Sequence, residues 1–243
     1  MPNFITLAVD GGAGTGKSTL SRLISSENKF MYVETGCLYR AITYLLLEMK
    51  ISPIDVGSEI LGKELEFTSK IIKSKYFLYV GGRDCSLLDL RTARINNKVS
   101  DYAALPAVRS FLVEFQKSQV GVAKLNGFNG IVMEGRDIGT VVFPEADHKF
   151  FMWANADIRA KRRHVQHLEN GKKARLNKIY EEIIKRDKKD FNRKIAPLKP
   201  AVNSVLLDTS YLDIEQVFKA IHEVLINKIN DKRDDKSKPI IRI

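Results

Sequence analysis

The stretch Gly11-Gly12-Ala13-Gly14-Thr15-Gly16-Lys17-Ser18-Thr19 fits the pattern G-x-x-x-x-G-K-S/T and separates two apolar segments. The segment before it, residues 4–9, predicts a buried strand, and the segment after it, residues 17–26, predicts a helix. In this setting the glycines let successive backbone N–H groups converge on phosphate oxygens, and the helix adds its positive dipole end. The Lys17 side chain would reach the outer phosphates, and the Ser18 hydroxyl would meet magnesium. The stretch therefore predicts a nucleotide-binding P-loop, and it leaves open which acceptor receives a phosphoryl group.

The order of the apolar segments indicates an α/β fold. Strands are expected at residues 4–9, 30–33, 131–133, 149–153 and 205–209, and helices at 17–26, 41–49, 88–99, 106–122, 156–170, 178–188 and 214–229. This alternation predicts a central parallel sheet flanked by helices on both faces. Three shorter strands at 65–68, 76–80 and 84–86, separated by turn residues, predict a small antiparallel insert.

Length and composition favour one domain in a reducing compartment. The chain has 243 residues, of which 44% are hydrophobic, and this suffices for one substantial core. Cys37 and Cys85 form neither a metal-ligand spacing nor a disulfide framework. No apolar run approaches a membrane span, and the N-terminus lacks the pattern of a signal peptide. We therefore expect a cytoplasmic protein.

The formal charge of +11 raises nucleic acid as a possible partner. Most of the excess lies in residues 159–194, which hold fourteen Lys or Arg against five Asp or Glu. A nucleic-acid binder could carry such a segment, and so could a lid that closes over the phosphates of two nucleotides. The P-loop favours the lid. This segment has two aromatic residues, Tyr180 and Phe191, and so few rings are unfavourable for base stacking on single-stranded nucleic acid.

Charged residues follow the predicted strands where their carboxyl ends would meet. Arg40 lies after the second strand, and Glu134, Arg136 and Asp137 lie directly after the third. In open parallel sheets the ligand crevice lies beyond these strand ends. Arginine binds phosphate oxygens bidentately and stays charged, so these positions suit phosphoryl transfer.

Several motifs taken together resemble the bacterial cytidylate kinases, a nucleoside monophosphate (NMP) kinase family. The resemblance runs in order from Ile5 to about Val224 and is carried by the P-loop, Thr35-Gly36-Cys37-Leu38-Tyr39-Arg40, Gly135-Arg136-Asp137-Ile138-Gly139-Thr140-Val141-Val142-Phe143-Pro144, Arg159-Ala160-Lys161-Arg162-Arg163, Arg186-Asp187 through Asp190, Arg193, and residues 196–201. It implies a P-loop kinase domain over residues 1–229, with an NMP-binding insert at about 35–122, a helical lid at about 156–194 and a flexible charged tail at 230–243.

The resemblance also implies an activity. The γ-phosphoryl group of Mg-ATP would pass to CMP or dCMP, giving ADP and CDP or dCDP in pyrimidine nucleotide metabolism. A carboxylate such as Asp137 accepts a hydrogen bond from the exocyclic amine of cytosine, whereas uracil presents a carbonyl, so CMP should be preferred over UMP. We expect no nucleic-acid partner, no membrane association and a monomer.

Roles for single residues follow from the resemblance. The ATP phosphates would be held by Gly11, Gly12, Ala13, Gly14, Thr15, Gly16, Lys17, Ser18 and Thr19, and Ser18 would meet Mg²⁺ without a dedicated protein metal site. CMP would be bound by Thr35, Tyr39, Arg40, Ser100, Arg109, Arg136, Asp137, Arg186, Asp190 and Arg193. The catalytic charges would come from Lys17, Arg136, Arg159, Arg162 and Arg186, with Arg159 and Arg162 in the lid.

Two acidic positions depart from the family pattern, because Glu34 and Glu134 stand where aspartates are usual. Glu134 is either an anchor or a residue that orients magnesium through water. Two other classes of function stay open: a different P-loop enzyme or switch, and a nucleic-acid binding module that uses residues 159–194.

Overall fold

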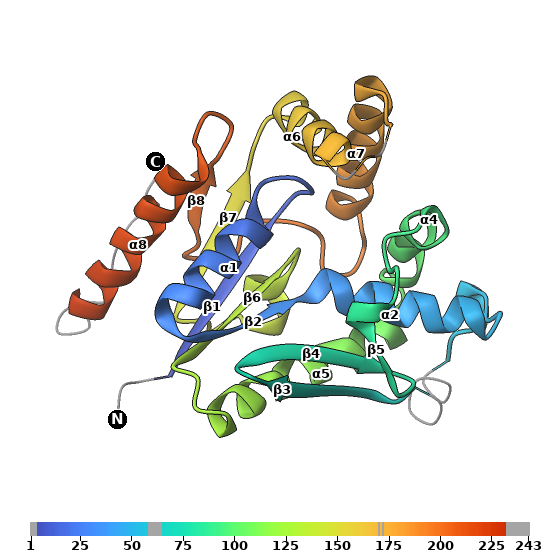
Figure 1. Ribbon diagram of the computed structural model, residues 1–243, viewed down its shortest axis with the longest axis horizontal. Helices are drawn as coiled ribbons and strands as arrows, with labels where there is room; N and C mark the ends of the chain where they lie inside the picture. The colour runs from blue at the N-terminus through green and yellow to red at the C-terminus, as the bar shows by residue number, and fades with distance from the viewer. Residues whose placement is uncertain (1–3, 58–64, 170, 172, 232–243) are drawn as a thin grey trace.

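The computed structural model describes residues 4–57, 65–169, 171 and 173–231, and a five-stranded parallel sheet forms its centre (Figure 1). The strand order is β2-β6-β1-β7-β8, with β1 at Ile5–Gly11, β2 at Phe30–Glu34, β6 at Gly130–Gly135, β7 at His148–Trp153 and β8 at Val205–Asp208. Each neighbouring pair is parallel, so the predicted central sheet is confirmed. The order places β1 between β6 and β7, and a crevice at the carboxyl ends of these three strands follows from that order.

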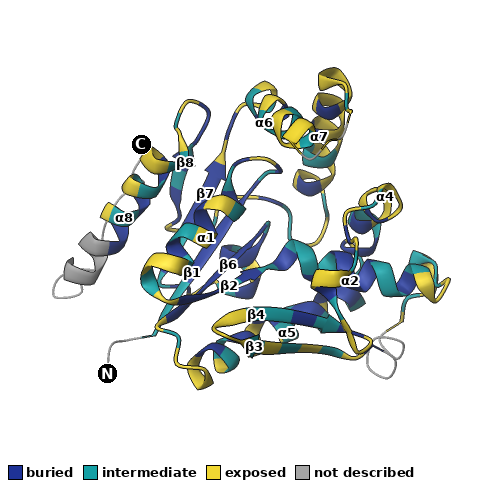
Figure 2. Cartoon of the chain, viewed as in Figure 1, coloured by how far each residue is buried: buried dark blue, intermediate teal, exposed yellow. Residues whose placement is uncertain are grey.

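Helices cover both faces of this sheet, as predicted. On one face lie α1 (Lys17–Asn28) and α8 (Ile214–Asp231), and on the other lie α2 (Thr35–Glu48) and α5 (Pro106–Leu125). Because side chains alternate along a strand, Leu7 and Val9 of β1 join the core under α1 and α8, whereas Ala8 joins the core under α2 and α5. Figure 2 shows the strands as the most continuously buried part of the chain.

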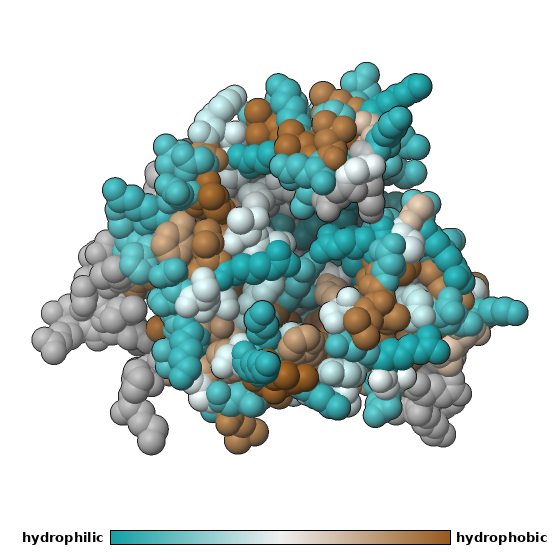
Figure 3. All heavy atoms as spheres, in the orientation of Figure 1, coloured by the Kyte–Doolittle hydropathy of each residue, from teal (hydrophilic) through white to brown (hydrophobic). Residues whose placement is uncertain are grey.

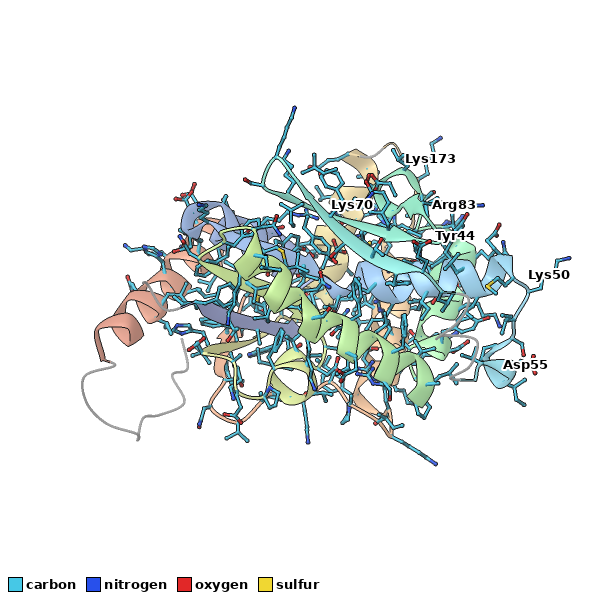
Figure 4. The ribbon with its side chains drawn as sticks, turned by 90° about the horizontal axis from the view of Figure 1, so that it is seen from below. Tyr44, Lys50, Asp55, Lys70, Arg83 and Lys173 are labelled. Carbon is cyan, nitrogen blue, oxygen red and sulfur yellow. The ribbon has the colours of Figure 1, made fainter. Side chains whose placement is uncertain are left out.

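The predicted antiparallel insert is also confirmed. It consists of β3 (Phe67–Ile72), β4 (Lys75–Val80) and β5 (Arg83–Asp84). Lys73 and Ser74 form the two-residue turn between β3 and β4, with φ of 47° and 60°. Seen from below, the hairpin lies beside α2, where Arg83 donates a hydrogen bond of 2.9 Å to the Tyr44 hydroxyl (Figure 4).

The largest differences from the predicted bounds concern two helix starts and two strands. The strand expected at 65–68 is β3, which begins at Phe67 and ends at Ile72. The helix expected from residue 41 begins at Thr35, because Leu38 adds to the buried face that Ala41 and Ile42 continue. The helix expected at 88–99 is α4 (Ala93–Tyr102), and residues 88–92 are not helical. The strand expected at 84–86 ends at Asp84, whose side chain accepts from the Ser86 N–H and starts a 3₁₀ turn at Cys85–Leu87.

Thr92 explains where α4 begins. Its side-chain oxygen accepts a hydrogen bond of 3.3 Å from the N–H of Ile95. Thr92→Ala should therefore lower the free energy of unfolding by about 1 kcal/mol, because one terminal N–H loses its cap. Urea denaturation measures this loss, and Lys98→Ala on the same helix is the exposed control. Equal stability of Thr92→Ala and the wild type would show that the cap contributes nothing.

The two helices expected to form the lid lie above the carboxyl ends of the strands (Figure 1). They are α6 (Ala156–Glu169) and α7 (Leu176–Phe191), and they pack through a small core of Ala160, Ile179 and Ile183. The predicted helical pair is thus confirmed, with residue 170 outside the described residues. The tail predicted from residue 230 overlaps the end of α8, and residues 232–243 lie outside the description.

Across the described ranges, no helix combines the length and the apolar character that crossing a bilayer requires.

Candidate functional site

The P-loop turns from β1 into α1 through backbone conformations that need glycine. Gly16 caps α1 with φ of 92°, in the left-handed region. At Gly11, with φ of 148°, a Cβ atom would lie 2.0 Å from the backbone oxygen of Met152. The local sequence therefore allows β7 to approach the loop closely and directs the first N–H groups of α1 toward the crevice.

Lys17 lies folded against the loop that it follows. Its Nζ donates to the Gly12 carbonyl oxygen at 2.6 Å and to Thr15 Oγ1 at 3.3 Å. Burial lowers the pKa of this amine to about 7, and the nearby charge of Arg136 acts in the same direction. The amine can thus lose its proton near neutral pH and regain it when an anion binds.

This pKa leads to a prediction about proton uptake. At pH 8 an amine with a pKa of about 7 is mostly uncharged, and bound phosphates favour its ammonium form. ATP binding at pH 8 should therefore take up about one proton, and binding at pH 6 much less, because the amine is already charged there. Calorimetry in buffers of different ionisation enthalpy measures the uptake.

The control is Lys17→Arg, which stays charged throughout this range. It should bind ATP at pH 8 with no proton uptake from this position. An equal uptake by the variant and the wild type would contradict the assignment.

Asp10, for which no sequence motif predicted a role, positions the segment that follows β6. Its two carboxylate oxygens accept from the N–H groups of Ile138 and Gly139, each at 2.8 Å. These two residues begin the single helical turn η3 (Ile138–Val142). Burial raises the pKa of Asp10 to about 6. The carboxyl group thus fixes Arg136 and Asp137, which immediately precede η3, next to the P-loop.

The residues expected to read the base lie on α2, α5 and the end of β6. Arg109 and Asp137 form an ion pair in which both side chains are almost fully buried. The Arg109 guanidinium lies over the Tyr39 ring, 5.7 Å from its centroid, and its Nη1 donates to the Ala103 carbonyl. Thr35 Oγ1 donates to the Glu134 carbonyl at 2.7 Å. Burial raises the pKa of Asp137, and the charge of Arg109 opposes that rise.

The structure brings Thr35, Tyr39, Arg109 and Asp137 to one end of the sheet. Ser100, the other residue expected to read the base, is partly buried on α4. Arg109 and Asp137 are 28 positions apart in the chain, so their pairing depends on how α5 packs beside β6.

The arginines expected to bind phosphate converge from three parts of the chain. Arg136 Nε pairs with Asp190 Oδ2 of α7 at 2.9 Å. Arg186, one turn earlier on α7, has a pKa lowered to about 9 by burial and by the charge of Arg136. Arg40 of α2 has a pKa lowered to about 10, first by burial and then by Arg91. Arginines that lie this close and repel one another are typical of a site that binds an anion.

Several donors of this group have no hydrogen-bond partner. In the described part of the chain, these buried and unpartnered atoms include Arg186 Nε and Arg193 Nε and Nη2. The pKa of Arg193 is lowered by burial, which Asp190 and Asp137 oppose. Unpaired guanidinium N–H groups are costly in a protein interior, so their presence here favours a bound phosphate.

The two lid arginines predicted to cover the triphosphate make other contacts in this structure. Arg159 donates to the Ala13 carbonyl of the P-loop at 3.1 Å and pairs with Asp187 of α7 at 2.7 Å. Arg162 donates to the carbonyls of Thr209 and Leu212, which follow β8. Arg159 therefore joins the P-loop to α6 and α7, and Arg162 joins α6 to the segment that follows β8.

Arg163 of α6 lies near Arg40 and Arg186, and its sequence context predicted no separate role for it. Its charge acts on Arg40 and Arg186, and burial lowers its own pKa while Glu182 opposes the shift. Arg91 and Glu34, also without a predicted role, form an ion pair of 2.7 Å on the same side. Three arginines in one pentapeptide gave no signal of which one would face the crevice.

Figure 3 shows a hollow beneath α6 and α7, with largely hydrophilic residues around it. On its far side from the P-loop, Lys189 of α7 pairs with Asp101 of α4 at 3.1 Å. The P-loop, the strand ends, α2, α4 and the helices α6 and α7 thus surround one polar space that is rich in arginine.

Comparisons with known proteins agree on one family. The family model described as "Cytidylate kinase" matches residues 7–227. A cytidylate kinase from Clostridium botulinum (strain Okra / Type B1) is 39% identical over 221 residues, which cover 91% of this chain and 97% of that protein. A cytidylate kinase from Clostridium tetani (strain Massachusetts / E88) is 40% identical over 225 residues, which cover 93% and 95%. A solved shikimate kinase from Bacteroides thetaiotaomicron covers 91% of this chain and 98% of its own at 11% identity, with a TM-score of 0.41, which is too distant to indicate function.

Proposed function

The chain belongs to the cytidylate kinase family, and on this premise we propose that it transfers the γ-phosphoryl group of ATP to CMP or dCMP. The products are ADP and CDP or dCDP. The observation that carries the proposal is the buried pair of Arg109 and Asp137 beside the P-loop end of the sheet. A buried carboxylate there has acceptor capacity beyond its arginine partner, and the exocyclic amine of cytosine can use it.

The reaction needs positioning and positive charge more than a general base, because the attacking atom is already a phosphate oxygen. Lys17 and the P-loop amides hold the outer phosphates of ATP. Arg40 and Arg193 hold the phosphate of the acceptor, and Arg136 and Arg186 neutralise the charge that develops on the transferred group. Each of these arginines is at least partly buried, so its attraction for phosphate is weakly screened.

The lid excludes water while the transfer proceeds. Arg159 connects α6 to the P-loop, and Lys189 connects α7 to α4 on the acceptor side. Both contacts join the two halves of the site, so closure of α6 and α7 would keep water from the phosphoryl group. Asp190 holds Arg136 through an ion pair and also serves as the ribose contact.

Magnesium is the implied cofactor, and the residues present fit it. Ser18 is the first hydroxyl of α1 and lies next to Glu134, whose Oε2 is buried and unpartnered within the described residues. The Ser18 hydroxyl would hold the ion together with the ATP phosphates. When bound, the ion would draw charge from the phosphate oxygens.

A coupled assay for ADP release tests the kinase against a nucleotide-hydrolysing switch. With Mg-ATP alone the release should be slow, and CMP or dCMP should each accelerate it many times over. Release that is equally fast without an acceptor would favour the switch.

The basic segment gives a second test. If residues 159–194 form a lid, RNA or DNA binding at physiological salt should be weak and should be displaced by ATP with CMP. Binding that persists in their presence would favour the nucleic-acid module. We further propose a cytoplasmic monomer with an NMP-binding insert at about 35–122 and a lid at about 156–194, and sedimentation tests the monomer.

A further inference from the structure

Glu134 occupies an unusual position for a carboxylate at the end of a fully buried strand. It is 4% exposed and lies beside the first turn of α1. Its Oε1 accepts two hydrogen bonds, from Ser18 Oγ at 2.6 Å and from the Tyr32 hydroxyl at 2.9 Å. One oxygen of the carboxylate is thus held from two sides.

The other oxygen, Oε2, is buried and has no hydrogen-bond partner among the described residues. A buried carboxylate oxygen without a donor is costly, because it has lost water and gained nothing in return. The same carboxylate contacts Ser18, the hydroxyl expected to hold magnesium, through its other oxygen, Oε1. A hydroxyl can donate its proton to Glu134 and still offer a lone pair to a cation.

Tyr32 is suited to fix this arrangement. It lies in β2 opposite Val132 of β6, and Glu134 is the residue two positions farther along β6 on the same side of the strand. Burial and the charge of Glu134 both raise the pKa of the phenol, so it stays a donor at any working pH. The Arg22 guanidinium lies over the ring, 5.5 Å from its centroid, and covers its outer face.

We propose that Tyr32 is a positioning residue for magnesium: its hydroxyl fixes the Glu134 carboxylate so that Oε2 accepts from a water molecule on the ion that Ser18 and the ATP phosphates hold. The inference rests on the proposed function. Glutamate has one more rotatable bond than the aspartate usual at this position, so holding it in place costs more entropy. The Tyr32 hydroxyl, as a second donor to Oε1, offsets that entropy cost better than the Ser18 hydroxyl alone would.

Tyr32→Phe tests the proposal by removing only the hydroxyl. The readout is equilibrium binding of a fluorescent ATP analogue, first with EDTA and then along a titration with Mg²⁺, with no acceptor present. The metal-free affinity should stay within twofold of the wild type, and the Mg²⁺ midpoint for the increase in affinity should rise about tenfold, as for other outer-shell ligands. Tyr102→Phe is the matched control, because Tyr102 also donates one phenol hydrogen bond, to Ile51 at 2.7 Å, outside the site.

Each outcome decides. An unchanged Mg²⁺ midpoint in Tyr32→Phe overturns the proposal, and so does a parallel loss of metal-free and metal-bound affinity, which would show a merely structural role. Should Tyr32→Phe fail to fold, Glu134→Gln replaces it. The glutamine amide keeps one oxygen that can accept from Ser18 and Tyr32, but it replaces Oε2 with an NH₂ donor and removes the negative charge. The Mg²⁺ midpoint of Glu134→Gln must therefore rise. An unchanged midpoint overturns the proposal. Because no acceptor is used, failure of CMP phosphorylation and failure of this inference are separate results.

Discussion

Arg186→Ala should lower kcat by about three orders of magnitude, in the range known for arginines that neutralise a migrating phosphoryl group. The side chain is partly buried, its buried Nε has no partner among the described residues, and its pKa is lowered to about 9. In the free protein Asp190 balances this charge only in part, against the repulsion from Arg136, so bound phosphates would complete the balance. Steady-state kinetics with CMP and Mg-ATP measures the loss.

The thermal stability of Arg186→Ala should be equal to or higher than that of the wild type, although its turnover falls. Removing Arg186 relieves its repulsion with Arg136, so Tm should equal or exceed that of the wild type. Lys185→Ala, an exposed neighbour on α7, should change neither quantity. Near-normal turnover of folded Arg186→Ala would contradict the role that we assign to it.

Asp137→Asn should remove most of the discrimination between CMP and UMP. The wild-type carboxylate accepts from the cytosine amine and repels the uracil carbonyl, whereas an amide can turn its oxygen to one base and its NH₂ group to the other. The ratio of kcat/KM for CMP to that for UMP should fall by about two orders of magnitude, the equivalent of one lost charge-assisted hydrogen bond.

Part of the effect will be a loss of stability. The change leaves Arg109 charged and unpaired in the interior, which costs about 3 kcal/mol. The two substrates are compared within one variant, so this general damage cancels in the ratio. Glu114→Gln, an exposed change on α5, is the control, and a ratio for Asp137→Asn equal to that of the wild type would refute base reading by Asp137.

Local pattern predicted most of the fold. The strands β1, β6 and β7 contain short apolar runs, which β1 and β6 combine with a glycine at the strand end, and their assignment needs no partner. The start of α4 was wrong, because Thr92 is a stronger signal for a helix start than the apolar residues before it. The start of α2 was placed too late, because Gly36 in the first turn lowers the helix propensity of a segment whose packing decides the matter.

The residues of the site also fall into those that local sequence motifs predict and those that only tertiary packing brings together. The P-loop and the Arg136-Asp137 pair are contiguous motifs, so they could be predicted from the sequence alone. The contact of Tyr32 with Glu134 depends on the register of β2 against β6, and the anchor at Asp10 depends on η3 lying beside β1. Arg162 and Arg163 are neighbours in sequence, but how α6 rests on the segment after β8 decides which of them reaches the crevice.

The most direct measurement is a competition. The protein is given Mg-ATP with equal concentrations of CMP, dCMP, UMP and AMP, and the diphosphates are separated by chromatography at early times. The account predicts that CDP and dCDP form first, with UDP far behind and ADP in step with total turnover. Equal formation of UDP, or an excess of ADP that indicates AMP as the acceptor, would contradict it.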